Sequence, residues 1–529
     1  MRTIFALAVL VFGTTGLLAF QVTFPDSPVV ITELPPTVTN SDRWVARTHA
    51  RDSDGVIYVV YSTTDAIKVS RSTDNGATWN HFATPGTRID SDDRLRSPCI
   101  AIDPGDTIYV AWKRCYGDIP DGFDVYWSKW NGKTWTAQKN LSQEAGRWPL
   151  ENFPHFLPSI AIDPAFTPHV VWDGSVTQWW YTIYYTHMDS LGEWAWPPEN
   201  VGYGDFENAG PNLIGDGRGN IHLGFIWLPD PKHSYAWYRK RFADGQWGES
   251  ESVCVVLDTL SSSPPSLTII PGDTLPHTAL GVGCLLVAHA PWASIYYRYH
   301  LSNGWSLPFK LMPDHYNWFP NQPLITADSQ GHLYAAWMLE QYTPSGLMVG
   351  RNIWMRMQEF APFWKEPFAV TRDTLQNGRL TVMNMYPMLG YPVTANGVDL
   401  TWVRGVSDSS GTRSYLMYHR LPSLLGVEQE KEKAPPSEPE LTLNPRPNPA
   451  RREMELVYGI PKQEMVNLTV YNLMGERVRT LVHGPTPAGV YRVKWNGKDE
   501  RLREAPSGTY FFQLTVGEKQ VAKKGTLVR

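Results

Sequence analysis

The chain has 529 residues, of which 19% are charged, and its formal net charge at pH 7 is -5. A mildly acidic balance does not indicate a polyanionic ligand, so we expect no nucleic-acid partner. The four cysteines have no Cys-x-x-Cys spacing, and no phosphate-binding loop or His-Glu-x-x-His motif occurs in the sequence. We therefore expect neither a metal site nor a bound cofactor.

The first 20 residues have the pattern of an export signal. Arg2 precedes the apolar run Ile4–Phe12, and small residues lie near Ala19. The run is shorter than the ~20 residues that a membrane-spanning helix needs. We predict a signal peptide over residues 1–20, no integral membrane span in the mature chain, and a secreted or outer-cell-surface location.

Oxidation of cysteines is possible in an exported chain. Three pairings of Cys99, Cys115, Cys254 and Cys284 can be drawn. We prefer Cys99–Cys115, because these two residues lie on adjacent apolar runs of one repeat.

The N-terminal region holds an isolated strand, Val29–Thr32, ahead of the first repeat. The last repeat, which ends near Arg420, lacks a closing strand of its own. We predict that the N-terminal strand completes the last sheet and closes a ring by hydrogen bonds.

A repeated unit, seen clearly at residues 98–135, fills residues 21–422. Its apolar runs 99–102, 107–112 and 124–130 have the length and the β-branched and aromatic content of strands. The second run of each copy ends at Tyr61, Trp112, Trp172, Trp227, His289, Trp337 or Trp402. A spacing of roughly 50–65 residues and sheets too thin to fold alone indicate radial stacking. We predict an all-β, seven-bladed β-propeller, with six blades as the alternative, in which most repeated aromatic residues fill the space between sheets.

The first repeat ends in a complete Asp-box, S-x-D-x-G-x-T-W. Its motif residues are Ser72, Asp74, Gly76, Thr78 and Trp79. We expect Asp74 to accept hydrogen bonds from turn amides, Gly76 to supply a positive φ, and Trp79 to pack on the sheet. With this motif, the chain resembles the sialidase and BNR-repeat β-propeller superfamily over roughly Trp44–Pro422. The resemblance implies a structural role for the Asp-box, away from any active site.

Residues 423–440 are rich in charge and proline and predict a flexible linker. Residues 441–529 then form a separate small β domain that resembles the FlgD-like immunoglobulin-type domain used as a C-terminal sorting domain in type IX secretion. The matching segments include 444–449, Trp495-Asn496-Gly497, 507–510 and 524–529. The resemblance implies contact with secretion machinery through residues 441–529. An ordinary sandwich module without a sorting role is the alternative.

Ligands of propellers usually bind where the loops before each inner strand and after each second strand share one face. Sialidase chemistry requires arginines that clamp a carboxylate, an acid, and a tyrosine nucleophile with a glutamate neighbour. The candidate catalytic residues are Arg96, Arg114, Arg404, Asp92 and Asp93. The candidate ligand-binding residues are Trp179, Trp180, Trp318, Tyr316 and Arg147. The family's Arg-Ile-Pro motif is missing, and residue spacing shows no tyrosine–glutamate pair.

Three hypotheses of function remain open. In the first, the propeller binds an extracellular glycan or protein at its central funnel without demonstrable catalysis. In the second, it is a divergent exo-glycosidase of sialidase type, which requires converging arginines, a carboxylate and a tyrosine–glutamate pair. In the third, it is a structural or adhesion module whose funnel is plugged by apolar side chains.

Overall fold

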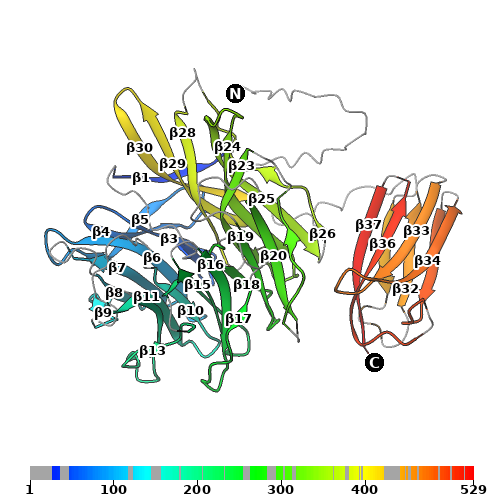
Figure 1. The fold of residues 1–529 in the computed structure, drawn as a ribbon, viewed down its shortest axis with the longest axis horizontal. Coiled ribbons are helices and arrows are strands. Elements are labelled where there is room, and N and C mark those ends of the chain that lie inside the picture. Colours follow the sequence, from blue (N-terminus) through cyan, green and yellow to red (C-terminus); the bar gives the residue numbers. More distant parts are fainter. Residues whose placement is uncertain are drawn as a thin grey trace.

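The computed structural model describes residues 27–35, 47–116, 123–143, 157–253, 262–421 and 441–528, with short internal gaps in the last three ranges (Figure 1). All secondary-structure elements within these residues are β-strands. In the described part of the chain, seven antiparallel sheets precede residue 422 and two further sheets follow residue 441. We number the first seven sheets by the chain order of their innermost strands.

Sheet 1 consists of β2 (His49–Arg51), β3 (Ile57–Ser62), β4 (Ala66–Ser72) and β5 (Asn80–Thr87). Sheet 2 consists of β6 (Arg94–Ile102), β7 (Ile108–Cys115), β8 (Phe123–Trp130) and β9 (Lys139–Asn140). Sheet 3 consists of β10 (Ser159–Ile162), β11 (Pro168–Thr177), β12 (Trp180–His187) and β13 (Glu199–Asn200). Sheet 4 consists of β14 (Glu207–Gly215), β15 (Ile221–Asp230), β16 (His233–Arg241) and β17 (Glu251–Ser252).

Sheet 5 consists of β18 (Ser266–Ile269), β19 (Pro276–Val282), β20 (Ser294–Leu301), β21 (Gly304–Trp305) and β22 (Phe309–Lys310). Sheet 6 consists of β23 (Trp318–Ala327), β24 (Leu333–Tyr342), β25 (Met348–Phe360), β26 (Phe363–Trp364) and β27 (Phe368–Ala369). Sheet 7 consists of β28 (Val382–Leu389), β29 (Val398–Asp408), β30 (Gly411–Leu421) and β1 (Val29–Leu34).

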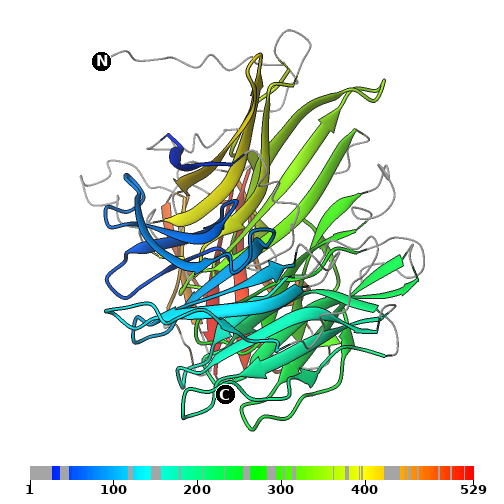
Figure 2. The ribbon, with the colours of Figure 1, turned by 90° about the vertical axis from the view of Figure 1, so that its left-hand side faces the viewer.

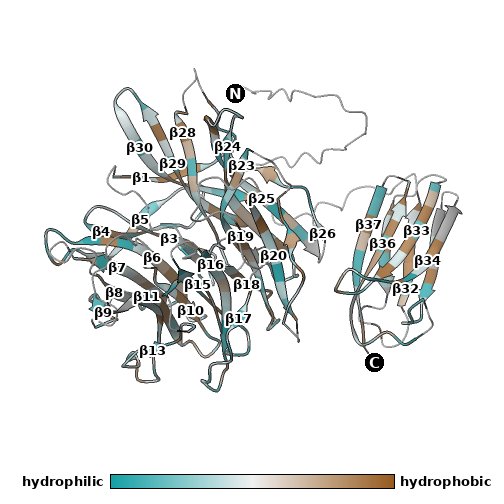
Figure 3. Ribbon diagram, viewed as in Figure 1, coloured by the Kyte–Doolittle hydropathy of each residue, from teal (hydrophilic) through white to brown (hydrophobic). Residues whose placement is uncertain are grey.

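The seven sheets follow one another around a closed ring, as the turned view shows by the colour order from blue to yellow (Figure 2). Each pair of consecutive sheets encloses its own cluster of buried apolar side chains, and hydrophobic segments lie along the strands (Figure 3). A further cluster joins sheet 7 to sheet 1 through Val403, Leu416, Val59 and Tyr61. Because every sheet is covered on both faces, the predicted β-propeller is confirmed as the fold of this region.

The aromatic residues at the ends of the second strands mostly fill the space between sheets. Trp112, Trp172, Trp337 and Trp402 are at most 1% exposed, whereas Trp227 is only partly buried. In sheet 5 the second strand ends at Val282, and His289 lies outside the described residues.

The N-terminal strand closes the ring as predicted. β1 pairs antiparallel with β30, with Val29 opposite Tyr418 and Leu34 opposite Ser414 (Figure 1). Sheet 7 therefore combines the first described strand of the chain with the last three strands of the propeller.

An aspartate, buried in sheets 2, 4 and 6 and partly buried in sheets 1 and 3, anchors the turn after the inner strand in five of the described sheets. In sheets 1, 2 and 6 it accepts a hydrogen bond from the tyrosine six residues later, in the pairs Asp52–Tyr58, Asp103–Tyr109 and Asp328–Tyr334. In sheets 3 and 4 the residue six positions later is a histidine, in the pairs Asp163–His169 and Asp216–His222. The spacing Asp-x5-Tyr/His is thus a second internal repeat, which sequence reasoning missed although the residues are visible in the sequence.

The preferred Cys99–Cys115 disulfide is not formed. Both residues carry thiols, and Cys99 pairs across the strands with Ala111, four positions before Cys115. At about 3.3 Å per residue, this register separates the two cysteines by roughly 13 Å along the strand. A disulfide needs Cα atoms within about 7 Å. Cys254 and Cys284 lie outside the described residues.

The C-terminal region is a sandwich of two sheets. One sheet contains β31 (Thr442–Arg446), β32 (Met454–Ile460) and β35 (Gly489–Trp495). The other contains β34 (Arg477–Thr486), β33 (Glu464–Tyr471), β36 (Gly508–Val516) and β37 (Lys519–Leu527). Trp495, fully buried, packs against Tyr510 and Phe512 in the core between them. The predicted immunoglobulin-like β-sandwich after the propeller is confirmed.

Candidate functional site

Antiparallel order brings the start of each inner strand and the end of each second strand to one edge of the sheet, which we call the upper edge. Several loops at this edge, including 117–122, 144–156 and 313–316, lie outside the described residues. Arg147, Trp179 and Tyr316 fall in the undescribed part, and the structure describes only the backbone of Trp180.

Arg114, predicted as part of a carboxylate clamp, is buried in a network at the upper edge of sheet 2. Its Nε donates to Asp93 over 2.8 Å, one Nη donates to Asp90 over 2.9 Å, and the other donates to the Tyr126 hydroxyl over 3.0 Å. The guanidinium carbon also lies 4.5 Å from the centre of the Tyr116 ring. Internal partners therefore already engage the guanidinium that a ligand carboxylate would need.

Asp93, a predicted acid, is buried beside Arg114. Burial by itself would raise the pKa of Asp93, but hydrogen bonds from Arg114 and from the amides of Asp90 and Ile89 outweigh it, so the pKa is lowered. A carboxyl group with a lowered pKa is a poor proton donor at neutral pH. Asp92 is exposed beside it, and Arg96 lies opposite the buried Lys113.

A tyrosine–glutamate pair lies at the upper edge of sheet 6. The Tyr342 hydroxyl donates to Glu340 over 3.0 Å, and Arg351 on the neighbouring strand forms a 2.6 Å ion pair with the other Glu340 oxygen. Arg351 also reaches the sulfur atoms of Met383 and Met385 in sheet 7. Burial, followed by the nearby Glu340 carboxylate, raises the pKa of Tyr342 to about 12.

Arg404, the third predicted clamp residue, lies next to this group in sheet 7. It donates to Asp373 over 3.1 Å, and the other Asp373 oxygen accepts from Asn384 over 2.8 Å. The Trp402 indole N–H donates to the side-chain oxygen Oδ1 of Asn384, which fixes the orientation of the Asn384 side-chain amide. Because Arg404 and Asp373 keep 35% and 23% of their side-chain surface exposed, this ion pair is accessible to a ligand.

Two groups therefore lie on either side of β28: Glu340, Tyr342 and Arg351, of which Arg351 contacts Met383 and Met385, and Asp373 and Arg404, which lie at Asn384. Together we call them the sheet 6–7 group. Only Arg404 among them was a predicted site residue. Glu340 and Tyr342 are two positions apart on one strand and so point to the same face, which is a signal that the sequence contains. The pairing of Glu340 with Arg351 depends on strand register.

The upper end of sheet 4 carries a row of partly buried aromatic rings. Trp227 and Tyr235 are cross-strand neighbours with ring centres 5.8 Å apart, and His233 stacks 6.4 Å beyond Tyr235. His233 forms a 2.7 Å contact with Asp230 at the tip of the same hairpin. Trp318, a predicted ligand residue, instead packs on Trp354 at 5.5 Å in the space between sheets 5 and 6.

Arg47 and Tyr391 cross the centre of the ring. Arg47, just before sheet 1, donates to the Leu267 carbonyl of sheet 5, and Tyr391, just after the inner strand of sheet 7, donates to the Ile269 carbonyl of sheet 5. The Arg47 guanidinium carbon lies 4.6 Å from the centre of the Tyr391 ring, and burial lowers the pKa of Arg47. An arginine and a tyrosine thus occupy this part of the central axis of the ring. The structural-module hypothesis expected apolar side chains there.

Asp173 is a fully buried carboxyl group between sheets 3 and 4. It accepts hydrogen bonds from the amides of Leu157 and Gly210, at 2.8 and 2.9 Å. Burial raises its pKa to about 7 despite these bonds and the nearby Lys113. Both oxygens are engaged by the backbone, so Asp173 holds the inner strands of two sheets together.

The Asp-box lies at the opposite, lower edge of sheet 1. Asp74 accepts from the Thr78 amide over 2.9 Å and from the Thr78 and Ser72 hydroxyls. These bonds lower the pKa of Asp74 to about 2. Gly76 has a φ of +90°, and Trp79 donates to the Gly76 carbonyl over 3.1 Å.

The described residues contain no helix with the length and apolar character required to cross a membrane. A model of the FlgD Ig-like domain family matches residues 458–520. A search of curated proteins gives no match.

Three similar solved structures illustrate the range of neighbours. An ulvan lyase, a polysaccharide lyase, has 10% sequence identity and a TM-score of 0.48, and the match covers 77% of this chain and 100% of that one. PorZ, a surface component of the type-IX secretion system of Porphyromonas gingivalis, has 12% identity and a TM-score of 0.38, with 92% and 60% covered. The Hadza microbial sialidase Hz136 has 11% identity and a TM-score of 0.37, with 72% and 66% covered. At these similarities the neighbours assign no activity to the present chain.

Proposed function

We propose that this protein is an extracellular propeller that binds an acidic glycan at the sheet 6–7 group. The observation that carries the proposal is a pair of partly exposed arginines on neighbouring sheets: Arg351 beside the Glu340 carboxylate that accepts from Tyr342, and Arg404 beside Asp373. Guanidinium groups recognise carboxylates and sulfates by paired hydrogen bonds, and the hydroxyl and carboxylate match sugar hydroxyls.

The donors of the two arginines support this proposal. Among the described residues, the buried Nε of Arg351 has no hydrogen-bond partner. A buried N–H group without an acceptor costs free energy, so an acceptor supplied by a ligand would relieve that cost. Arg404 donates only one of its N–H groups to Asp373 in the described structure, which leaves donors for an anionic group.

A second surface at the upper edge, separate from the sheet 6–7 group, is the aromatic row of sheet 4. Trp227 and Tyr235 offer flat apolar faces, while Asp230 and His233 at the same tip offer polar groups. This combination suits a saccharide, which has both C–H faces and hydroxyl groups.

A glycan array tests the proposal with the full-length protein. We expect uronate-containing or sialylated glycans to bind in preference to neutral ones. Arg404→Ala should weaken this binding at least tenfold, because it removes a charge-assisted contact. The matched control is Arg413→Ala, which breaks the exposed Arg413–Asp408 pair in the same sheet and should leave binding unchanged. Equal binding of neutral glycans, or unchanged binding by Arg404→Ala, contradicts the proposal.

The second candidate function is exo-glycosidase activity, favoured specifically by the Tyr342–Glu340 hydrogen bond. Tyrosine acts as nucleophile in sialidases, and Glu340 is placed to take the Tyr342 proton. Under this hypothesis the wild-type protein hydrolyses a fluorogenic sialoside and Tyr342→Phe does not. Absence of turnover by the wild type, together with selective glycan binding, would remove the hypothesis.

We also propose that residues 1–20 direct export and that residues 441–529, after a linker at 423–440, contact the secretion machinery. The family match to residues 458–520 supports the second part. A chain truncated after residue 422 should then remain in the cells of the source organism, whereas the full chain reaches the surface or the medium. Equal export of both forms would favour an ordinary sandwich module.

A further inference from the structure

The junction between sheets 7 and 1 is where the two ends of the propeller meet. The chain leaves β1 at the edge of sheet 7, runs through sheets 1 to 6, and returns to form β28, β29 and β30. Contacts between the first and last segments therefore hold the ring closed. Strong contacts are needed here, because loss of this junction opens the ring.

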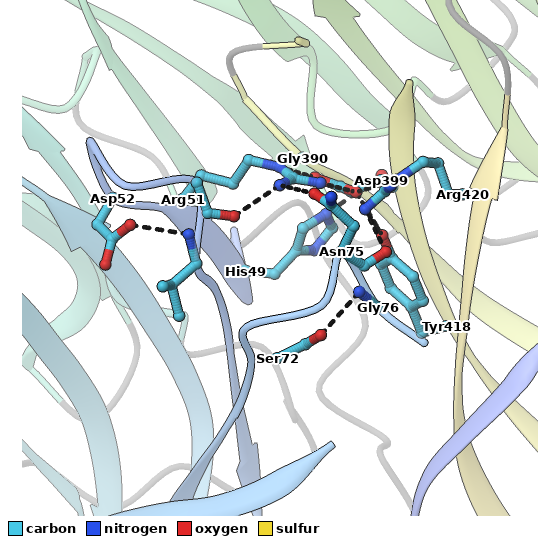
Figure 4. Close-up of polar contacts among 12 residues, drawn as sticks. His49, Arg51, Asp52, Ser72, Asn75, Gly76, Gly390, Asp399, Tyr418 and Arg420 are labelled. Carbon is cyan, nitrogen blue, oxygen red and sulfur yellow. Dashed lines mark hydrogen bonds and ion pairs between the residues drawn. The ribbon is translucent and has the colours of Figure 1, made fainter. Parts of the chain in front are cut away.

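Asp399 of β29 is the centre of these contacts (Figure 4). Arg51 of β2 donates to its two carboxylate oxygens over 2.6 and 2.8 Å, and the Tyr418 hydroxyl donates over 2.6 Å. The Asp399 carbonyl oxygen contacts His49 Nε2 at 3.2 Å and accepts from the Gly390 amide over 2.9 Å. The Arg51 and Asp399 side chains are only 5% and 4% exposed, so this two-bonded ion pair is largely shielded from water.

The Asp-box turn of sheet 1 packs against the same place. Gly76 lies so close to the Tyr418 ring that a Cβ at this position would overlap it. Trp79 contacts Tyr418 edge-on, with ring centres 5.0 Å apart. Arg420 donates to the carbonyl of Asn75, whose side chain in turn accepts from Arg51 over 3.4 Å (Figure 4). The turn is therefore a contact element for the last sheet as well as a local structure.

At three other junctions the inner strands are joined by bonds to uncharged side chains, although Asp173 and Arg356 place charged groups at the junctions of sheets 3–4 and 5–6. The amides of Leu213, Leu267 and Ile325 donate to side chains of the preceding sheets, namely Ser159, Asn212 and Ser266. Removal of one such bond leaves no buried charge. Removal of the Asp399 carboxylate leaves Arg51 buried without its counter-charge, which is strongly unfavourable.

We propose that Asp399 and the Asp-box turn form a latch that closes the propeller, and that the ring opens first between sheets 7 and 1 when this latch is weakened. The latch is independent of the proposed glycan site, which lies at the opposite edge of the sheets. It also gives the Asp-box of this chain a role in ring closure that a purely local turn would not have.

Hydrogen–deuterium exchange of the full-length protein tests the latch, because it shows which strands lose protection when the ring opens. In Asp399→Asn, backbone amides of β1, β2, β3 and β30 should exchange at least tenfold faster than in the wild type, while β15 and β16 of sheet 4 stay protected. The matched control is Asp408→Asn. Asp408 lies in β29 like Asp399, but its ion pair with Arg413 is exposed, so this variant should leave the exchange rates of both sets of strands unchanged. An unchanged pattern, or equal acceleration in sheet 4, overturns the proposal.

If Asp399→Asn does not fold, Tyr418→Phe provides a milder variant for the same exchange measurement. This variant removes only the hydroxyl that donates to Asp399 and keeps the ring that covers Gly76. We expect a several-fold acceleration confined to β1, β2, β3 and β30. Exchange identical to the wild type, or acceleration spread evenly over all sheets, overturns the latch.

Discussion

Tyr342 and Glu340 share a 3.0 Å hydrogen bond at the upper edge of sheet 6, with the tyrosine as donor. The two residues occupy alternate positions of β24, so the strand itself orients both side chains to one face. Arg351 neutralises the glutamate from the next strand. The arrangement keeps a protonated tyrosine beside a charged glutamate, which determines how the proposed site responds to pH.

Glycan binding should be insensitive to alkaline pH up to about pH 10.5. Burial and the Glu340 carboxylate raise the pKa of Tyr342 to about 12, so the hydroxyl remains protonated and able to donate over this range. Binding of an acidic glycan, measured by calorimetry at pH 7.5, 9 and 10.5, should give the same affinity. Tyr342→Phe should bind more weakly at every pH by a constant factor. A loss of wild-type affinity by pH 9 that Tyr342→Phe does not share would contradict this prediction.

Gly76→Ala should destabilise the protein far more than the same substitution at Gly132. Both glycines have similar left-handed backbone conformations, with φ of +90° and +88°. A Cβ at Gly132 meets nothing within 4 Å, so the cost is backbone strain of about 1 kcal/mol. At Gly76 the same strain is joined by overlap with the Tyr418 ring, which should raise the loss to about 3 kcal/mol or more. Urea unfolding of both variants measures the difference, and equal losses would show that Tyr418 moves aside freely.

The buried histidines should destabilise the fold as the pH falls below about 6.5, and the raised pKa of Asp173 partly opposes this effect. His169, His222 and His277 are buried in the propeller, and each contacts a tyrosine hydroxyl at 2.7 Å. Burial lowers the pKa of all three, that of His277 to about 4. A lowered folded-state pKa means that the unfolded chain takes up protons first. Their stabilising contribution is therefore complete above pH 6.5 and declines as the pH falls towards 4.

The size of this acid effect can be measured on one histidine. For His277 a shift from about 6.5 to about 4 corresponds to about 3 kcal/mol lost by pH 4. Scanning calorimetry between pH 7.5 and 4.5 should show a smaller decline in melting temperature for His277→Gln than for the wild type. His81→Gln, at an exposed position, is the control and should follow the wild type. Parallel declines for all three proteins would refute the assignment to His277.

The architecture of the propeller followed from features that are local in sequence. Strand-length apolar runs, turn residues and a repeated tryptophan were enough, because every sheet except sheet 7 is built from one continuous segment. The pairing of β1 with β30 was also predictable, since an unmatched strand at one end met an incomplete sheet at the other. The regular repeat was thus sufficient to predict the fold.

The environment of the site residues was not predictable in the same way. Arg114 was a reasonable clamp residue by type and position, but Asp93 and Tyr126, which occupy its donors, lie 21 and 12 residues away. Arg351 joins Glu340 only because the β24–β25 register places them opposite each other. Sequence spacing shows which residue types are present at an edge, whereas strand register and neighbouring sheets decide which of them are already bonded.

The thiols of Cys99 and Cys115 should remain reduced in the purified protein. The strand register that places Cys99 opposite Ala111 keeps Cys115 too far along β7 for a disulfide. Burial also raises the pKa of the Cys99 thiol to about 12, which suppresses the reactive thiolate. In a Cys254→Ser, Cys284→Ser background, a thiol reagent should therefore label Cys115 well before Cys99 under native conditions. Both should be labelled in denaturant without added reductant, and the further substitution Cys99→Ala should leave one labelled site. Recovery of a peptide that links Cys99 to Cys115 from non-reduced protein would show that the two strands pair in a different register from the one described.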